Sequence, residues 1–153
     1  MTPPGLEAFI VRAKAHTYAG SGGERPSCRP ASHDLGFDEA PWRYLDSYFG
    51  GADFIGQEVV WNDDEPVWAM NYYGRILADA RIAAATAGLV IKAALTALYR
   101  EGRFLGGFEF GMDGMTYRDR SQGTVAAFAG RETISIAGDE VYALDYHGGL
   151  IRP

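Results

Sequence analysis

The sequence predicts an α+β fold in which an antiparallel sheet carries two main helices on one face, and three observations lead to it. Two segments have apolar residues at helical spacing, several short stretches alternate as strands do, and one stretch occurs twice. The elements follow the order helix, three strands, helix, three strands. With 153 residues, 47% of them hydrophobic and 22% charged, the chain is expected to form a single globular domain, residues 1–153.

The duplicated stretch covers residues 54–74 and 128–148. At a constant offset of 74 residues and without a gap, seven of its positions are identical, well above chance. They are Phe54/Phe128, Gly56/Gly130, Glu58/Glu132, Val67/Val141, Ala69/Ala143, Tyr72/Tyr146 and Gly74/Gly148. We interpret the stretch as part of tandem α-β-β-β repeats, residues 6–76 and 79–151, packed about a pseudo-two-fold axis.

In the first repeat, apolar residues from Leu6 to Tyr18 fall near helical spacing and predict an amphipathic helix. Residues 19–41 contain many Gly, Ser and Pro residues and predict a long loop, of the kind that forms a functional lid or stays disordered. Strand character begins at Trp42. A hairpin then follows around the turn NDDEP.

In the second repeat, an alanine-rich helix is predicted over residues 79–100, and Gly102 ends it. A glycine-rich connection leads to a strand over about 115–121. The second hairpin is expected to close on a type II′ turn at Gly138-Asp139. Shifted by one strand, the element order resembles the β-α-β-β units of the GyrI-like and SOUL haem-binding superfamily.

The expected turns bring acidic residues together. A turn at Gly138-Asp139 pairs Glu132 with Asp145, and the same offset pairs Glu58 with Asn71. Like charges directly opposite one another destabilise a sheet, and an apolar surrounding raises the pKa of a carboxyl group, so the face that holds them is a candidate site. Its candidate ligand-binding residues, drawn from both repeats, are Glu58, Asn71, Tyr73, Glu132, Asp145 and His147. The alternative is that this face is partly solvated and its charges simply contact water.

The segment CRPASHD is the second candidate site. Cys28 beside Arg29 and His33 can be a nucleophile with a lowered pKa or a free structural thiol. Arg29 and His33 can cover a cleft on the expected pseudo-two-fold axis and bind an anionic group there. The alternative is that Ser32 and Asp34 cap the following strand.

Composition excludes several classes of function. The net charge of −6, with both signs scattered, argues against a nucleic-acid surface. A single cysteine allows no internal disulfide and agrees with a cytoplasmic location, and the N-terminus lacks the pattern of a signal peptide. The apolar run over residues 78–99 is interrupted by charged residues and glycine, which favours a buried helix over a membrane span.

We predict no metal ion and no cofactor. The three histidines are far apart, neither HExxH nor CxxC spacing occurs, and the glycine-rich runs lack the lysine of a phosphate loop.

Four segments resemble a known family: SCRPASHDL, YLDSYFGGADFIGQEVVW, PVWAMNYYGRIL and VYALDYHGGLI. Together they are similar to an uncharacterised bacterial family, a domain of unknown function whose most specific pieces are WAMNYYGR and the terminal YHGG. Members of that family also occur joined behind a helix-turn-helix of the Xre type. The resemblance implies a regulator-associated domain that binds an effector, and it assigns no catalytic residue.

Three hypotheses about function follow. The first is a cytoplasmic domain that binds a small molecule as a sensor, without catalysis. The second is a small hydrolase or isomerase that uses Glu132, Asp145 and His147 as acid and base. The third is an interaction module that forms a homodimer.

Overall fold

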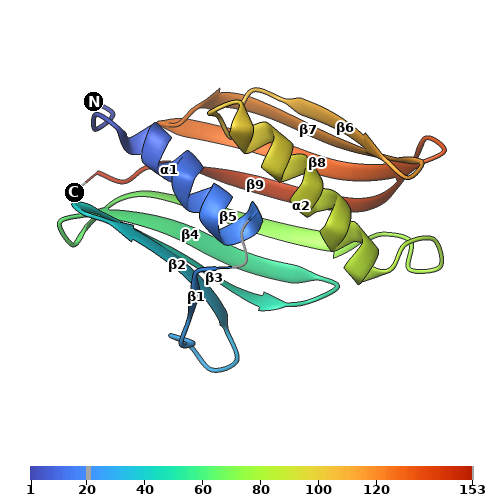
Figure 1. The fold of residues 1–153 in the computed structure, drawn as a ribbon, viewed down its shortest axis with the longest axis horizontal. Helices are drawn as coiled ribbons and strands as arrows, with labels where there is room; N and C mark the ends of the chain where they lie inside the picture. The colour runs from blue at the N-terminus through green and yellow to red at the C-terminus, as the bar shows by residue number, and fades with distance from the viewer. Residues whose placement is uncertain (20–21, 153) are drawn as a thin grey trace.

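The computed structural model describes residues 1–19 and 22–152, and its centre is one antiparallel sheet of nine strands. The strand order is β1-β2-β3-β4-β5-β9-β8-β7-β6, so the two halves of the chain share a single sheet. Both helices lie across the same face of that sheet (Figure 1). The predicted α+β class, with an antiparallel sheet and two helices, is confirmed.

The first half of the chain contributes one helix and five strands. Its elements are α1 (Leu6–Lys14), which continues as a π-helix η1 (Ala15–Ala19), β1 (Glu24–Arg25), β2 (His33–Glu39), β3 (Trp42–Gly50), β4 (Phe54–Asn62) and β5 (Glu65–Ile76). The second half contributes one helix and four strands. Its elements are α2 (Ala84–Arg100), β6 (Phe108–Met112), β7 (Met115–Thr124), β8 (Ala127–Ile136) and β9 (Asp139–Leu150).

Two stretches that we expected to be irregular contain strands. The segment 19–41, of which residues 20–21 lie outside the described part, holds β1 and β2, and the connection 102–114 holds β6. Strand β2 is short and interrupted by a glycine, so its alternation is weak. It forms because all seven of its residues pair with β3, which is an effect of the neighbouring strand rather than of local sequence.

Strands β5 and β9 join the two halves at the centre of the sheet. They are antiparallel, and Tyr72 lies directly opposite Tyr146, its counterpart in the duplicated stretch. The pairing of β5 with β9 is therefore symmetric about these two tyrosines. Strands β4 and β3 extend outward on one side of this pair, and β8 and β7 extend in the same order on the other.

The expected register of both hairpins was wrong by one residue. Glu132 pairs with Leu144 and Glu58 with Met70, not with Asp145 and Asn71. The turn after β8 lies at Ala137-Gly138, one residue before the predicted position, and both of its residues have positive φ. A bulge then shifts each hairpin, between Val60 and Trp61 in the first and between Ile134 and Ser135 in the second. Because side chains alternate between faces, a slip of one residue moves every partner to the opposite face.

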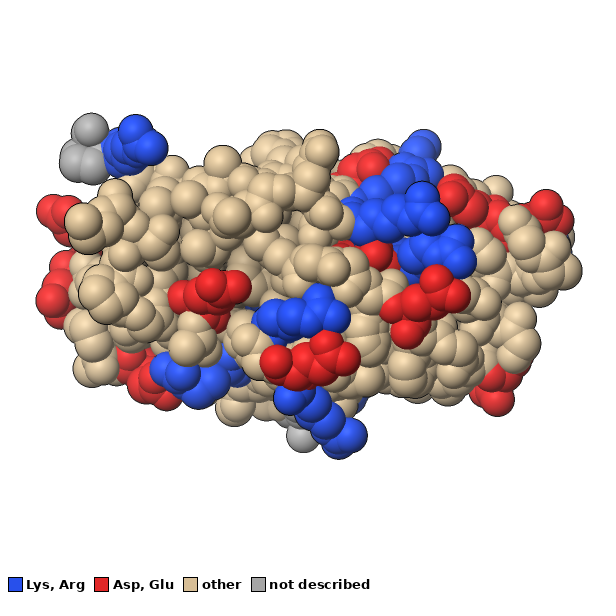
Figure 2. All heavy atoms as spheres, turned by 90° about the horizontal axis from the view of Figure 1, so that it is seen from above, with Lys and Arg blue, Asp and Glu red and all other residues tan. Residues whose placement is uncertain are grey.

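The face under the helices holds the core. Trp68 stacks on Phe128 with 5.8 Å between ring centroids, and Phe9 of α1 stacks on Trp42 at 5.7 Å. On the surface drawn in Figure 2, basic side chains gather in one patch at the upper right, and acidic side chains lie next to them. None of the helices in the described residues is long and apolar enough to span a bilayer.

Two glycines allow the central tyrosines to lie flat across neighbouring strands. A Cβ atom on Gly56 would stand 2.5 Å from the hydroxyl of Tyr72, and a Cβ atom on Gly130 would overlap the ring of Tyr146. Gly56 pairs with Tyr72 and Gly130 with Tyr146 in the ladder. The Phe-x-Gly-x-Glu sequence that opens both hairpins therefore includes the glycine over which a tyrosine packs.

Replacement of either glycine by alanine is expected to destabilise the protein by about 1–3 kcal/mol, because the tyrosine ring cannot keep its place. Urea unfolding of Gly56→Ala and Gly130→Ala measures this loss. Gly111→Ala is the matched control, since it lies in β6 with no atom within 4 Å of the added Cβ. A loss in the control as large as that in the two variants would contradict the explanation.

Candidate functional site

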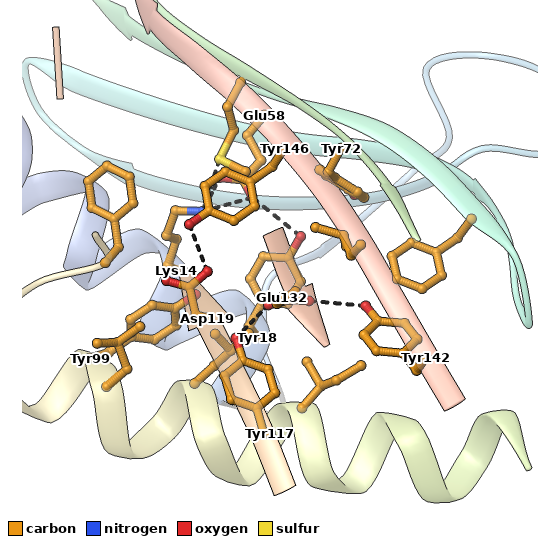
Figure 3. Close-up of a pocket in the computed structure, with 17 residues that line it drawn as sticks. Lys14, Tyr18, Glu58, Tyr72, Tyr99, Tyr117, Asp119, Glu132, Tyr142 and Tyr146 are labelled. Carbon is orange, nitrogen blue, oxygen red and sulfur yellow. Dashed lines mark hydrogen bonds and ion pairs between the residues drawn. The ribbon is translucent and has the colours of Figure 1, made fainter. Parts of the chain in front are cut away.

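A cavity of about 80 Å³ lies between the sheet and α2, and side chains from both halves of the chain line it. Its walls combine apolar side chains of α2 with polar side chains that project from five strands, from α1 with η1 and, for Tyr99, from α2. In Figure 3 the polar groups point toward one another above α2. These polar residues are Lys14, Tyr18, Glu58, Tyr72, Tyr99, Tyr117, Asp119, Glu132, Tyr142 and Tyr146.

Four carboxyl groups form two pairs on the inner face of the sheet. Asp46 of β3 lies directly opposite Glu58 of β4, and Asp119 of β7 lies directly opposite Glu132 of β8. Their exposed fractions are 0%, 1%, 4% and 7%, respectively. Carboxyl groups this deeply buried are rare unless they are paired, because the ionised form loses its hydration. Each pair therefore needs donors from the protein.

In the first half the donors come from the N-terminal helix as well as from the sheet. Lys14 lies 2.9 Å and 2.6 Å from the two carboxylate oxygens of Glu58, at the point where α1 passes into the π-helix. Tyr72 donates a hydrogen bond of 2.6 Å to Asp46, and Tyr18 donates one of 2.7 Å to its other oxygen. Three of these four oxygens accept a hydrogen bond, and the fourth, Oε2 of Glu58, has no hydrogen-bond donor among the described residues but contacts the ammonium group of Lys14 as an ion pair.

In the second half the donors come from the sheet alone. Tyr117 and Tyr142 donate to the two oxygens of Glu132, at 2.5 Å and 3.0 Å. Tyr146 donates to Oδ1 of Asp119 at 2.7 Å, as Tyr72 does to Asp46. The second oxygen of Asp119, Oδ2, is buried and has no hydrogen-bond partner among the described residues. Asp119 thus lacks the second donor that Tyr18 supplies to Asp46.

The pKa values of these acids reflect burial. Burial raises the pKa of Asp46 to about 7, with a further contribution from the charge of Glu58, while the hydrogen bonds from Tyr18 and Tyr72 oppose the rise. Burial and the nearby Asp119 raise the pKa of Glu132 to about 7 against its two tyrosine donors.

Burial also raises the pKa of Asp119, while the hydrogen bond from Tyr146 opposes that rise. The pKa values of Tyr18 and Tyr72 are raised by burial and by the neighbouring carboxylates, so these hydroxyl groups remain protonated donors. The cluster can therefore hold protons near neutral pH and accept hydrogen bonds from a donor placed in the cavity.

A second, larger chamber of about 330 Å³ adjoins the cavity beneath the N-terminal part of α2. Six residues line both spaces: Tyr18, Phe54, Tyr72, Ile91, Leu95 and Tyr142. The outer chamber is mostly apolar, and the glycines of the β3–β4 turn and Gly88 of α2 belong to its lining. Together the two spaces form a site with an apolar outer part and a polar inner end.

The structure brings together only two of the six residues that we expected in the sheet site. Glu58 and Glu132 line the cavity. Asn71, Tyr73, Asp145 and His147 are exposed and lie on strand positions that alternate with the inner-facing ones. Asp145 bonds to Arg131 at 2.9 Å. The predicted acid–base group of Glu132, Asp145 and His147 is therefore not assembled.

The segment after Cys28 is a structural turn. Asp34 accepts hydrogen bonds from Ser32 and Ser47 at 2.8 Å each and from the amide of Cys28 at 3.0 Å. Burial opposes ionisation of Asp34, but these hydrogen bonds outweigh it and lower its pKa to about 2. Asp34 lies inside β2 and joins the preceding turn to Ser47 of β3, rather than capping the strand that follows.

The other two candidates of that segment do not line the cavity. Arg29 bonds to Ser47, and its guanidinium lies 4.5 Å from the ring centroid of Phe49. His33 packs on Tyr48 at 5.0 Å. The thiol of Cys28 is exposed.

Sequence reasoning missed Asp46 and Asp119, although a signal existed. Tyr44-Leu45-Asp46 and Tyr117-Arg118-Asp119 repeat at an offset of 73 rather than 74. At the β3–β4 turn, three residues separate the paired Gly50 and Phe54. At the β7–β8 turn, four residues separate the equivalent pair, Gly123 and Phe128. A comparison that allows one gap finds the pattern. Lys14 and Tyr18 carry no such signal.

The described residues contain no group of three or more His, Cys, Asp or Glu side chains placed to hold a metal ion.

The pH dependence of stability is expected to change in Glu132→Gln. The pKa of Glu132 is 4.5 when unperturbed and about 7 in the fold, so the folded state favours the protonated acid. Wild-type stability is therefore lost as the pH rises from about 4.5 to 7, by roughly 3 kcal/mol from this group. The uncharged glutamine avoids that loss, so its stability relative to wild type rises over this range. Urea unfolding at several pH values between 4.5 and 7 measures the difference in unfolding free energy between the variant and wild type. Glu140→Gln, at an exposed position, is the control. A difference for Glu132→Gln that does not change with pH would contradict a raised pKa of Glu132.

Lys14→Met is expected to destabilise the protein by about 3–5 kcal/mol, because it leaves the charge of Glu58 buried without a cation. The double variant with Glu58→Gln is expected to recover most of that loss. Arg12→Met is the control on the same helix, since Arg12 pairs with Glu39 at the surface and contributes at most about 1 kcal/mol. Equal losses in Lys14→Met and Arg12→Met, measured by urea unfolding, would refute a buried ion pair.

Comparison with known proteins identifies a family but no individual relative. No curated protein and no solved structure matches the chain, so the similarity to the GyrI-like and SOUL folds stays a prediction. A family model matches residues 46–151, a range that contains all four buried carboxyl groups of the cluster but not Lys14 or Tyr18. The chain belongs to this family, the domain of unknown function DUF5680.

Proposed function

We propose that this chain is a small-molecule-binding domain whose ligand occupies the cavity and the outer chamber beneath α2. The observation that carries the proposal is a cluster of four buried carboxyl groups, three of which line an inner cavity that adjoins a mostly apolar chamber. Small-molecule sites usually combine a concave apolar lining with a few convergent polar groups, and this site has both.

The polar cluster is costly as a structural element alone. Apolar residues of similar volume at these positions avoid the desolvation of carboxyl groups, and buried ion pairs are often no more stabilising than such replacements. Two of the acids have pKa values of about 7, which means that the fold opposes their ionisation. Groups perturbed in this way inside a cavity gather at functional sites.

The geometry favours binding over acid–base catalysis. Glu132 lies inside, whereas Asp145 and His147 are exposed on the other face. The acids in the cavity are held by tyrosine hydroxyls and by one lysine, an arrangement suited to accepting hydrogen bonds.

We further propose that the domain is a cytoplasmic sensor associated with a regulator, and that its halves, residues 6–76 and 79–151, descend from one duplicated unit. The matched positions at the offset of 74 and the pairing of Tyr72 with Tyr146 support duplication. In that history the glycine, the glutamate and the central tyrosine were kept in both halves. The role as a sensor is the one that the family resemblance implies.

A thermal-shift screen with a fragment library that includes cationic, neutral and anionic members tests binding. Gly88→Leu is designed to fill the outer chamber, because Gly88 lines it and a Cβ atom there meets no atom within 4 Å. The variant is expected to be at least as stable as wild type, since leucine has a helix propensity roughly 1 kcal/mol better than glycine. Fragments that stabilise wild type are expected to lose their effect on it.

Ala85→Leu is the matched control, since it adds the same side chain to an exposed position of α2 outside the chamber lining. It should keep the thermal shifts of wild type. Absence of stabilisation by every fragment, or equal shifts in Gly88→Leu, would refute binding at this site.

A further inference from the structure

We infer that the ligand of this site is a protonated amine with an apolar body, whose ammonium group binds next to Oδ2 of Asp119 and whose body extends into the outer chamber. This inference rests on the proposed function and adds the charge and shape of the ligand to it. Three features carry it: the charge of the cavity, the free oxygen of Asp119 and the aromatic wall around the existing ammonium group.

The first feature is a deficit of positive charge. The cluster contains four buried carboxyl groups, and Lys14 is the only cationic side chain that lines the cavity among the described residues. Lys14 is already committed to Glu58. Arg103 lies near enough to influence Asp119, but its guanidinium bonds to Glu101 and to two backbone carbonyl groups. Lys92 of α2 lines the outer chamber but not the inner cavity. A second cation is therefore the species that the inner cavity lacks.

The second feature is the position where that cation fits. Asp119 lines the cavity and is 4% exposed, and its Oδ2 atom has no hydrogen-bond partner in the part of the chain that the structure describes. A buried acceptor without a partner costs free energy, most of all when it is charged. The corresponding oxygen of Asp46 receives the hydroxyl of Tyr18. An N–H donor from a ligand would supply to Asp119 what Tyr18 supplies to Asp46.

The third feature is that the cavity already accommodates an ammonium group. The Nζ atom of Lys14 lies 5.4 Å from the ring centroid of Phe104 and 5.8 Å from that of Tyr18. An ammonium near an aromatic face is stabilised by the ring quadrupole, particularly where water is excluded. Figure 3 shows the carboxyl group of Asp119 beside Lys14, on the side of Tyr99. The same aromatic surroundings suit a second organic cation.

The apolar body follows from the outer chamber. The inner cavity, at about 80 Å³, has room for a small head group, whereas the adjoining chamber of about 330 Å³ is lined mainly by apolar and aromatic side chains. A small inorganic cation would fill the inner space and leave the chamber to water. An amine with an aromatic or aliphatic body uses both spaces.

Three probes with the same body and different head groups test this inference: phenylpropylamine, phenylpropanol and phenylbutyrate. Isothermal titration calorimetry at pH 8, above the pKa of about 7 of Asp46 and Glu132, is expected to show the amine binding about tenfold more tightly than the alcohol. The reason is that the ammonium group adds the attraction of an ion pair to its hydrogen bond with the carboxylate, which the neutral hydroxyl group cannot. The carboxylate is expected to bind most weakly. In Asp119→Asn the preference for the amine over the alcohol is expected to fall to about threefold or less, because the amine loses an ion pair and the alcohol only part of a hydrogen bond.

Asp145→Asn is the control, since it removes the same charge from the outer face and should leave the preference intact. The wild-type order of the three probes is informative even if Asp119→Asn fails to fold. If the alcohol or the carboxylate binds more tightly than the amine, and Gly88→Leu abolishes that binding, the ligand is not an amine although the site is correct. If wild type prefers the amine and Asp119→Asn keeps the same preference over the alcohol, the ammonium group does not bind next to Asp119. Absence of binding by all three probes, together with a fragment screen without hits, would overturn the site itself.

Discussion

The burial of four carboxyl groups beside a single lysine is the constraint on which this structure depends. An ionised carboxyl group loses several kcal/mol of hydration in such a place, so each one must find donors or keep its proton. Tyrosine hydroxyls are suitable donors because burial and the neighbouring charges keep them protonated. The choice of tyrosine at several inner-face positions follows from this requirement.

The same requirement couples the N-terminal helix to the sheet. Lys14 and Tyr18 stand one helical turn apart, and both reach the carboxyl groups of β3 and β4. Lys14 is the last residue of α1 and Tyr18 lies in the π-helical turn that follows it, a kind of turn that is frequent at functional sites. Strands β7 and β8 receive no comparable donor from α2. In the first half, each carboxyl oxygen therefore has a donor or a cation beside it. In the second half, Oδ2 of Asp119 can accept a further hydrogen bond.

Much of the architecture could be predicted from sequence, because it depends on periodicity. The two helices, the central hairpins and the antiparallel sheet follow from spacing and from turn residues. Glu58 and Glu132 could be selected because they stand at matched positions on otherwise apolar strands. The faces of Asn71, Asp145 and His147 were wrong, because a bulge and a turn displaced by one residue shift the register, and neither is visible in the composition of the strand.

The sequence by itself determined the alternation of helices and strands, the matched Phe-x-Gly-x-Glu openings and the pair of glutamates, since each depends on residues close together in the chain. Only the tertiary structure decided that Lys14 neutralises Glu58, that Tyr146 crosses Gly130 to reach Asp119, and that one oxygen of Asp119 stays without a partner. These contacts join residues that lie tens of positions apart along the chain. Their existence depends on the strand register and on how the helices lie over the sheet, which local sequence does not specify.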